Sequence, residues 1–533
     1  MGLFKFAGRG VLLGALFFAG CEPTGSGPVP EPTYIPPTID DTVPKGKPQT
    51  DAGTVRQDAG VTTTVDAGTI IDAGSIADSG TSEQDAGETT VDAGTMSDAG
   101  YVDAGLPPTS FPSIPNWTFY GPQHGLPMNV NGVSADEGGN IWVAGGEAGL
   151  FVLRPGNANF ERFTMAEGLR PYGYMADGSE PPGSKYLNVL TVQGGPPGTV
   201  FVGYKGKGVN VQCEGNFDTA ATADPSIYKS GDADRVTLNG NGISVVHYDI
   251  WTGPGNTTAY PDGREKLCDI YSILWDKAAG VVWFGGNHGF ALGLDDYAGN
   301  VSCNGVWSCS GVMEHIHPLV TGYWTNAKTT AVTLSGGYRA MALYENHDVF
   351  VGADIRSTRF KFGTNGGLSS YGNAYWASQP QSESDTSNHF DIWPDLSNEP
   401  SPAERKDDAV FGVARAADGS FWVGSAAYGL AHVSESGVVL GNLQSELVAP
   451  HVSRVTLDPA DNSIWAGARH GGGISRLQGG TVTKYGWNTF GPLLSSMPVT
   501  DIQVMDSGSN RKMLIGFDAY SGKPGAVGIY SGN

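Results

Sequence analysis

The sequence contains 533 residues, 79 of them glycine, and carries a formal net charge of −23 at pH 7. This acidic balance argues against nucleic acid as a partner, because phosphates repel a polyanion. Residues 22–112 hold 15 acidic and 3 basic residues, so the acidic excess is shared between a low-complexity segment and the rest of the chain.

The first 20 residues predict an export signal. Lys5 and Arg9 give a basic start, and residues 11–19 form an apolar run that is too short to span a bilayer. The run ends in Phe18-Ala-Gly-Cys21, which resembles the lipobox of bacterial lipoproteins, with Phe18 where Leu is usual. The resemblance implies a mature chain that starts at Cys21 and touches the membrane only through acyl chains. Glu22 replaces the Asp that retains similar lipoproteins at the inner membrane, which favours the outer membrane of a bacterial cell envelope. A plain secretory signal is the alternative.

Residues 21–112 predict a disordered tether. The segment is rich in proline up to Pro48 and then repeats the tripeptide Asp-Ala-Gly, starting at Asp51, Asp58, Asp66, Asp72, Asp85, Asp92, Asp98 and Asp103. Its apolar content is too low to offset the entropy lost on ordering. The carboxylates are too sparse for a calcium loop. We therefore expect a spacer between the anchor and a single domain at residues 113–533.

A short apolar strand followed by a glycine-rich turn recurs seven times in this domain. The first copy is Asn140-Ile-Trp-Val-Ala-Gly-Gly, with Trp142 at its key position. The corresponding residues of the later copies are Phe201, Trp283, Phe350, Trp422, Trp465 and Leu514. Two residues further on stands Gly in six copies and Ala144 in the first. Such a period is typical of a repeat architecture.

Each copy follows an alternating apolar segment, which predicts a β-hairpin. Four of the turns begin with an aspartate that can bond its own backbone, namely Asp136, Asp276, Asp418 and Asp458. A third strand is expected after each copy, for example at residues 149–153, 209–211 and 429–433. Three or four short strands in each of seven units predict an all-β, seven-bladed β-propeller.

The two ends of the domain predict ring closure. Phe160-x-x-Phe163 ends the first unit, and Trp117-x-x-Tyr120 has the same spacing but precedes every unit. The last unit stops after its third strand at residues 526–530. We therefore expect the N-terminal strand to complete the seventh blade, which would protect both sheet edges.

The segment from Gly125-Leu126-Pro127 to Leu150 resembles the two-component-regulator propeller repeat, and degenerate copies extend through the domain. In that family the propellers are sensory domains of histidine kinases outside the membrane, so the resemblance implies a binding or sensing module. No kinase, transmembrane or Ig-like segment is apparent in this sequence. The resemblance thus supports the fold more than a signalling role.

Loops after the second strand of each blade are expected to share one face with the connections between blades. Their titratable and aromatic residues are candidate ligand contacts: Glu147, Lys205, Lys207, His288, Arg356, Tyr428, Arg469, His470, Asp518 and Tyr520. The cationic members favour a small anionic ligand. Aromatic residues of the long insertions, such as Tyr172, Trp324 and Trp376, favour a glycan or a protein. The alternative is that these residues are solvated loop tips and small insertion cores.

His288 and His470 occupy matching loops of blades three and six. Two imidazoles across the axis from each other would allow acid–base chemistry. The alternative function is therefore a propeller enzyme, a lyase or hydrolase similar to streptogramin lyases, and a third alternative is a structural surface component. The sequence predicts a monomeric binding module with no metal and no cofactor.

Four cysteines follow Cys21, and an even number in an exported chain indicates disulfides. Cys303 and Cys309 flank a short loop and form the first predicted pair, which leaves Cys213 with Cys268. A zinc site is the alternative, but Cys303 and Cys309 do not have the spacing of a zinc knuckle.

Overall fold

The computed structural model describes residues 109–171, 186–209, 228–248, 269–287, 289–297, 319–321, 331–333, 335–355, 357–364, 366–367, 409–506 and 511–532. The predicted signal, nearly all of the predicted tether, the five cysteines and the insertion aromatics lie outside these residues. The predicted anchor and disulfides therefore stay predictions.

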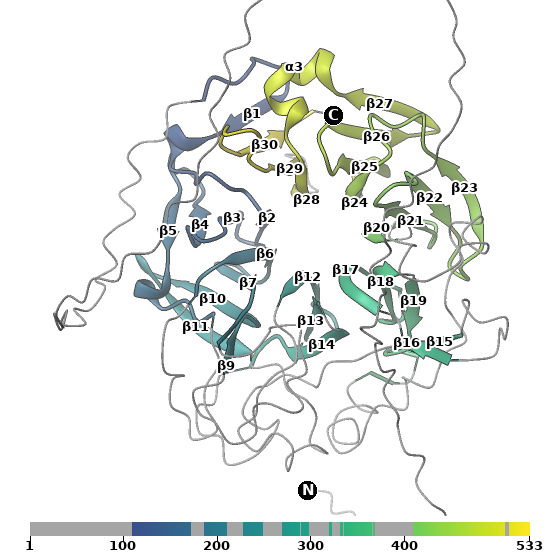
Figure 1. The fold of residues 1–533 in the computed structure, drawn as a ribbon, viewed down its shortest axis with the longest axis horizontal. Coiled ribbons are helices and arrows are strands. Elements are labelled where there is room, and N and C mark those ends of the chain that lie inside the picture. Colours follow the sequence, from purple (N-terminus) through teal and green to yellow (C-terminus); the bar gives the residue numbers. More distant parts are fainter. Residues whose placement is uncertain are drawn as a thin grey trace, which may run out of the picture. The chain divides into compact units, whose positions relative to one another are not determined.

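Seven antiparallel sheets are arranged as blades around a central axis, which confirms the predicted propeller (Figure 1). Blade one contains β2 (Gly132–Ala135), β3 (Ile141–Ala144), β4 (Leu150–Leu153) and β5 (Glu161–Phe163). Blade two contains β6 (Val189–Gly194), β7 (Thr199–Tyr204), β10 (Ala233–Asn239) and β11 (Gly242–Tyr248). Blade three contains β12 (Ile270–Asp276), β13 (Val281–Gly286) and β14 (Gly289–Leu294). Blade four contains β17 (Ser335–Leu343), β18 (Val349–Ile355) and β19 (Ser357–Phe360).

The last three blades follow the same plan. Blade five contains β20 (Val410–Arg415), β21 (Phe421–Ser425), β22 (Leu430–Val433) and β23 (Val439–Leu443). Blade six contains β24 (Val452–Asp458), β25 (Ser463–Ala468), β26 (Ile474–Gln478) and β27 (Thr481–Tyr485). Blade seven contains β28 (Val499–Asp506), β29 (Lys512–Phe517), β30 (Ala526–Tyr530) and, from the other end of the domain, β1 (Trp117–Tyr120).

Smaller elements lie outside the blades. Two short strand pairs are formed by β8 (Lys207–Val209) with β9 (Tyr228–Ser230) and by β15 (Leu319–Thr321) with β16 (Ala331–Thr333). The helices within the described ranges are η1 (Pro122–His124), η2 (Met165–Glu167) and α3 (Trp487–Ser496). The last is kinked, because Gly491 has φ 67° and Pro492 follows it.

The ring is closed by β1, as the sequence predicts. This strand pairs antiparallel with β30, from Trp117 opposite Tyr530 to Tyr120 opposite Val527. Trp117 is 8% exposed, and its ring stacks on Phe119 and meets the edge of Phe490. Both ends of the domain are thereby held by one sheet and one aromatic cluster.

The third strand of blade two differs from the prediction. It was expected at residues 209–211, but β10 is the strand that pairs with β7. Lys207–Val209 instead pairs with β9 outside the blade. The insertion thus lies between the second and third strands, where a hairpin can be lengthened without disturbing the blade.

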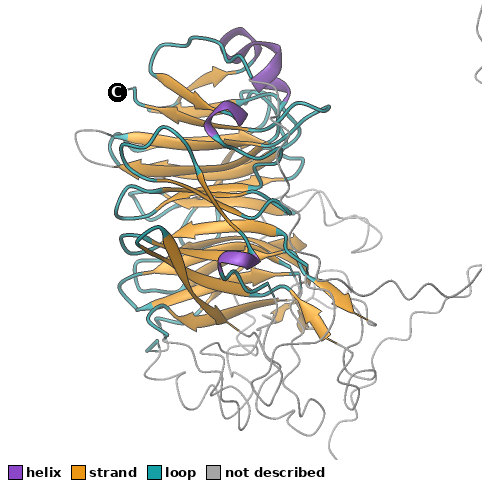
Figure 2. Cartoon of the chain, turned by 90° about the vertical axis from the view of Figure 1, so that its left-hand side faces the viewer, coloured by secondary structure: helices purple, strands orange, loops and turns teal. Residues whose placement is uncertain are grey.

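The first strand of every blade lies nearest the central axis, and we call it the inner strand (Figure 1). It starts at the face where the second strand ends. In blade six Val452 lies opposite Ala468, and in blade seven Val499 lies opposite Phe517. We call this the upper face. The strands run between this face and the opposite one, and the connecting loops gather at both (Figure 2). The expectation that loops after the second strand share a face with the starts of the inner strands is confirmed.

The repeated glycine allows close packing between blades. A Cβ atom on Gly424 would lie 2.4 Å from Val452 Cγ1, and one on Gly467 would lie 2.5 Å from Val499 Cγ1. Both valines are the first residue of the next inner strand. Carbon atoms cannot approach so closely, so only glycine fits.

The turn after the inner strand lies at the opposite, lower face, and in blade one its aspartate bonds within the turn and to the next blade. Asp136 accepts backbone N–H groups from Gly138 at 2.8 Å and, across the blade boundary, from Gly198 at 3.1 Å. Its other contacts include Trp142 Nε1 at 2.9 Å, which fixes the key aromatic residue in the core. Asp136 therefore stabilises its own hairpin, as predicted, and also links blade one to blade two.

Candidate ligand site at the upper end of the channel

Six inner strands carry one extra residue at the same level, close to the upper face. In blades two to seven the pairing with the second strand skips this residue. The skipped residues are Leu190, Tyr271, Arg339, Phe411, Ser453 and Thr500. Such bulges bend a strand and re-aim a side chain, and they are frequent next to functional sites. Blade one, where Ala144 replaces the glycine, shows no such shift.

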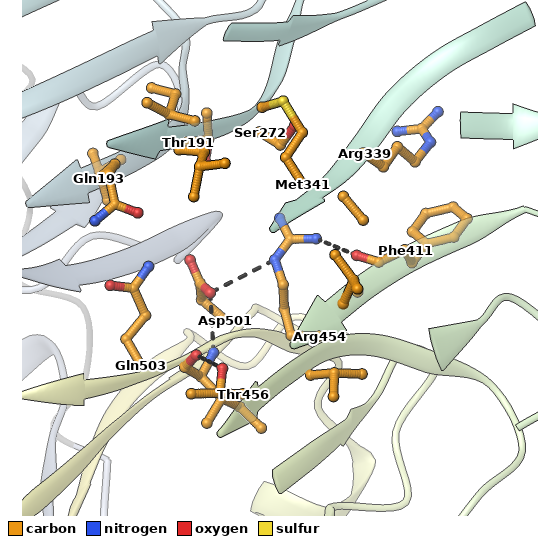
Figure 3. A pocket seen from close by; sticks show the side chains of 18 of the residues that line it. Thr191, Gln193, Ser272, Arg339, Met341, Phe411, Arg454, Thr456, Asp501 and Gln503 are labelled. Carbon is orange, nitrogen blue, oxygen red and sulfur yellow. Dashed lines mark hydrogen bonds and ion pairs between the residues drawn. The ribbon is translucent and has the colours of Figure 1, made fainter. Parts of the chain in front are cut away.

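A cavity of about 250 Å³ occupies the channel just below this level. It is lined by the inner strands of blades two to seven, and Figure 3 shows its polar side chains converging from opposite walls. The polar members include Thr191, Gln193, Ser272, Thr456 and Gln503. Gln503 is fixed on blade seven, because its Oε1 accepts a hydrogen bond from Ser134 Oγ of blade one at 2.6 Å.

Three arginines meet at Phe411 of blade five. Arg469 Cζ lies 3.9 Å and Arg339 Cζ 5.0 Å from the centroid of the Phe411 ring. Arg454 Nη1 donates a hydrogen bond to the Phe411 carbonyl at 3.0 Å. We call these residues the arginine cluster. Cation–π attraction holds guanidinium groups on an aromatic face, so the bulge that aims Phe411 also positions the arginines.

Two members of the cluster have carboxylate partners. Arg339 Nε is 2.6 Å from Asp354 Oδ1, and its guanidinium also stacks over Tyr271, with 4.1 Å between Cζ and the ring centroid. Arg454 Nε is 3.6 Å from Asp501 Oδ1, a looser pairing in the cavity wall (Figure 3). Burial raises the pKa of Asp501 to about 6, against the charge of Arg454, which lowers it.

Arg469 has no carboxylate partner among the described residues. Among the residues that the structure describes, its guanidinium makes no hydrogen bond or ion pair, and it stacks on the Phe411 ring. Partial burial lowers the pKa of Arg469, and the charge of Arg339 lowers it further, whereas the charge of Asp354 raises it. The guanidinium therefore carries a positive charge that its surroundings do not compensate.

His470 lies beside Arg469 on the upper face. Its ring centroid is 5.4 Å from that of His451, in an edge-on arrangement, and His451 Nδ1 is 2.8 Å from the Ala426 carbonyl oxygen. Partial burial lowers the pKa of His470, and the charge of Arg469 and the proximity of His451 add to this shift. This lowered pKa favours the neutral form of the imidazole.

The other predicted contacts are spread over the upper loops. Glu147 is exposed and accepts a hydrogen bond from Tyr186 Oη at 3.3 Å. Lys205 is exposed, Tyr428 is half-buried against the core of blade five, and Tyr520 is 50% exposed. Lys207 belongs to β8. His288 and Arg356 lie outside the described residues, so their position relative to His470 and Arg469 stays a prediction.

Asp518 has a structural position. Its Oδ1 accepts backbone N–H groups from Val130 at 3.1 Å and Ala519 at 2.8 Å, and burial raises its pKa. Because Val130 precedes blade one and Asp518 follows β29 of blade seven, the carboxylate connects the first blade to the last.

Sequence reasoning found Arg469 and missed Arg339, Phe411, Arg454 and Asp501. These residues lie on inner strands, whose apolar alternation predicts a strand and not a site. A signal was present, because a charged residue interrupts three of those strands near its upper end: Arg339, Arg454 and Asp501. A charge at that point of a buried strand indicates a polar channel.

Two negative findings apply to the part of the chain that the structure describes. It contains no cluster of three or more His, Cys, Asp or Glu side chains placed to hold a metal ion. None of its helices has the length and apolar character needed to cross a membrane.

No protein-family profile matches the chain, and no curated protein is similar to it in sequence. Several solved propellers resemble it weakly. The extracellular domain of a putative hybrid two-component system from B. thetaiotaomicron is 13% identical, with a TM-score of 0.31, and the match covers 73% of this chain and 46% of that one. YCF48 bound to a D1 peptide is 11% identical, with a TM-score of 0.40 and coverages of 80% and 100%. Sqt1 of Saccharomyces cerevisiae is 10% identical, with a TM-score of 0.42 and coverages of 79% and 100%.

Proposed function

We propose that the protein is a ligand-binding or sensing module of the bacterial cell envelope, and that the upper end of its channel is the recognition site. The observation that carries this proposal is the polar cavity lined by the inner strands of six blades. Side chains on paired strands of a closed ring lose little freedom when a ligand binds, and such preorganisation favours affinity. The ligand classes are those expected from the sequence: a small anionic molecule, a glycan or a protein.

The test is a binding screen with the purified full-length chain against envelope sugars, peptides and organic anions, read as a thermal shift. Replacing Gln193 and Gln503 together by alanine removes two amides that face the cavity, and we expect a hit to lose affinity about tenfold. Gln444→Ala on the exposed connection after β23 is the matched control. A hit that binds both variants equally well would place recognition outside the channel.

Attachment to the outer membrane is part of this proposal, and it rests on Phe18-Ala-Gly-Cys21. Two or more acyl chains hold a protein stably on a bilayer, whereas a single chain does not. We expect Cys21→Ser to move the protein from the membrane fraction to the soluble fraction. Retention of the variant in the membrane fraction would contradict the lipid anchor.

A lyase or hydrolase is the second candidate, and the contact between the His470 and His451 rings is the observation that favours it. A neutral imidazole can accept a proton from a substrate. The two functions separate on the hit from the binding screen. An enzyme would consume the hit and lose this turnover in His470→Ala, whereas a binding module would leave the hit unchanged and bind it equally well in the variant.

A further inference from the structure

The arginine cluster contains one positive charge more than the carboxylates that pair with it. Asp354 pairs with Arg339 and Asp501 with Arg454, but no described carboxylate pairs with Arg469. Asp269 is also near the rim, yet it accepts hydrogen bonds from Tyr271 Oη and the backbone N–H of Gly206 and pairs with none of the three arginines. Like charges around one aromatic ring repel each other, and a bound anion would relieve this repulsion.

The cluster also has donors to spare. Among the described residues, the guanidinium of Arg469 makes no hydrogen bond. Arg454 forms its short hydrogen bond to the Phe411 carbonyl through Nη1, and Arg339 forms its short hydrogen bond to Asp354 through Nε. A guanidinium presents its N–H groups in a planar fork that matches the two oxygens of a carboxylate. Arg339 and Arg454 line the cavity, and Arg469 stacks on the ring of Phe411, which is also part of the lining.

The cavity limits the size of the ligand. Its volume of about 250 Å³ lies just below the range of roughly 300–1,000 Å³ that is usual for sites of drug-sized molecules. One unpaired positive charge is balanced by one negative charge. This match favours a carboxylate, which carries a single charge, over a phosphate dianion, which carries two. The rings of Phe411 and Tyr271 at the rim hold the guanidinium groups of Arg469 and Arg339 in place.

We propose that the arginine cluster binds the carboxylate of a small monoanionic ligand about the size of one ring, with Arg469 as the principal contact. This inference rests on the proposed function, in which the upper channel is the ligand site, and it names the chemical class of the ligand. Arg339 and Arg454 orient the carboxylate, and the polar wall below them faces the remainder of the molecule.

The experiment is a calorimetric titration of the purified full-length chain with two matched pairs of probes. Galacturonate and benzoate carry the carboxylate, and galactose and benzamide are their neutral counterparts. We expect at least one acid to bind saturably and at least about tenfold more tightly than its counterpart, the effect of one charge-assisted bidentate pair. Sulfate tests the charge and is expected to bind more weakly than the acid.

Arg469→Gln removes the unpaired guanidinium and should weaken binding of the acid about tenfold without changing that of the neutral probe. Lys484→Gln removes the same charge from the outer strand of the same blade, where its Nζ contacts the Ser445 carbonyl, and should change neither. Arg469→Lys keeps the charge without the planar fork and should give an intermediate loss; it also serves if the Gln variant does not fold.

Several results would overturn the inference: no saturable binding of either acid, equal binding of acid and neutral probe, tighter binding of sulfate, or an equal loss in Lys484→Gln. The Gln193→Ala/Gln503→Ala variant separates this failure from that of the proposed function. If binding of a neutral probe depends on these glutamines while Arg469→Gln has no effect, the channel is the ligand site and the proposed binding of a carboxylate by the arginine cluster is wrong. If no probe depends on either set of residues, both proposals fail.

Discussion

Gly424 and its counterparts set the distance between neighbouring blades. We expect Gly424→Ala to lower the free energy of unfolding by about 1–3 kcal/mol, because its Cβ would lie 2.4 Å from Val452 Cγ1 and 2.9 Å from Val455 Cγ2. Gly441→Ala on β23 is the matched control, since no atom lies within 4 Å of that position, and its effect should be neutral or slightly stabilising. Urea unfolding measures both variants. Equal stability of the two would contradict the packing role of the repeated glycine.

Asp501 links the stability of the propeller to pH. Its pKa is about 6 in the folded state, against 3.8 for an unperturbed aspartate, so the folded state binds more protons between these two pH values. The contribution of Asp501 to stability therefore falls as the pH rises from about 4 to about 6, by an amount on the order of 3 kcal/mol.

Asp501→Asn should remove this contribution, which urea unfolding at several pH values detects as a smaller loss of stability over that window than in the wild type. Asp418→Asn supplies a control of opposite sign, because hydrogen bonds from Ser420 lower the pKa of Asp418. The contribution of Asp418 is present above its unfolded pKa and is lost as the pH falls. Parallel pH curves for Asp501→Asn and the wild type would exclude Asp501 as the titrating group.

At the scale of the element, Trp117 is the most buried aromatic residue through which β1 packs on blade seven. Trp117 is surrounded by Phe119, Tyr485, Phe490 and Tyr530. We expect Trp117→Ala to cost about 3–5 kcal/mol of unfolding free energy, as for other buried aromatic residues. Trp487 is 64% exposed, so Trp487→Ala should change stability by less than about 0.5 kcal/mol. Chemical unfolding compares the two, and a small effect at Trp117 would mean that β1 contributes only backbone pairing.

The strands of the propeller could be predicted because their pattern is local. The key aromatic residue, the glycine two positions later and the aspartate of the turn all lie within one hairpin. Closure by β1 was also predictable, since Trp117-x-x-Tyr120 repeats the spacing of Phe160-x-x-Phe163. The third strand of blade two was not, because β10 is separated from β7 by an insertion that hides the period.

The arginine cluster could not be predicted in this way. Arg339, Phe411 and Arg469 come from three blades, and they meet only because the bulges in β17 and β20 aim the first two toward the upper rim. A bulge leaves no mark in an alternating pattern beyond a shift of one residue. The loop residue Arg469 was identified from its place after the second strand, but its contact with Phe411 depends on long-range packing.

At the scale of the whole molecule, contacts on the lower face run from one blade to the next. Asp136 reaches Gly198 of blade two, Asp276 accepts from His347 Nδ1 of blade four at 2.8 Å, and Asp458 pairs with Arg511 of blade seven at 2.8 Å. Together with the glycine contacts, they make the packing of each blade depend on its neighbour. A ring coupled in this way has no free end at which unfolding can start, as long as β1 stays in place.

Removing β1 tests this dependence directly. We expect a chain that starts at Leu126 to be less stable than one that starts at Ser113, because it loses the pairing of Trp117–Tyr120 with β30 and the aromatic packing of Trp117. The loss also exposes the edge of β30, whose unpaired N–H and C=O groups can pair with a second chain. Urea unfolding and light scattering measure the two effects.

Trp117→Ala in the longer chain separates them, since it removes the ring but keeps the paired edge and should therefore unfold early without associating. If the shorter chain matched the longer one in stability and remained monomeric, the six remaining blades and the three strands of blade seven would close the ring without β1, and the role assigned to this strand would be wrong.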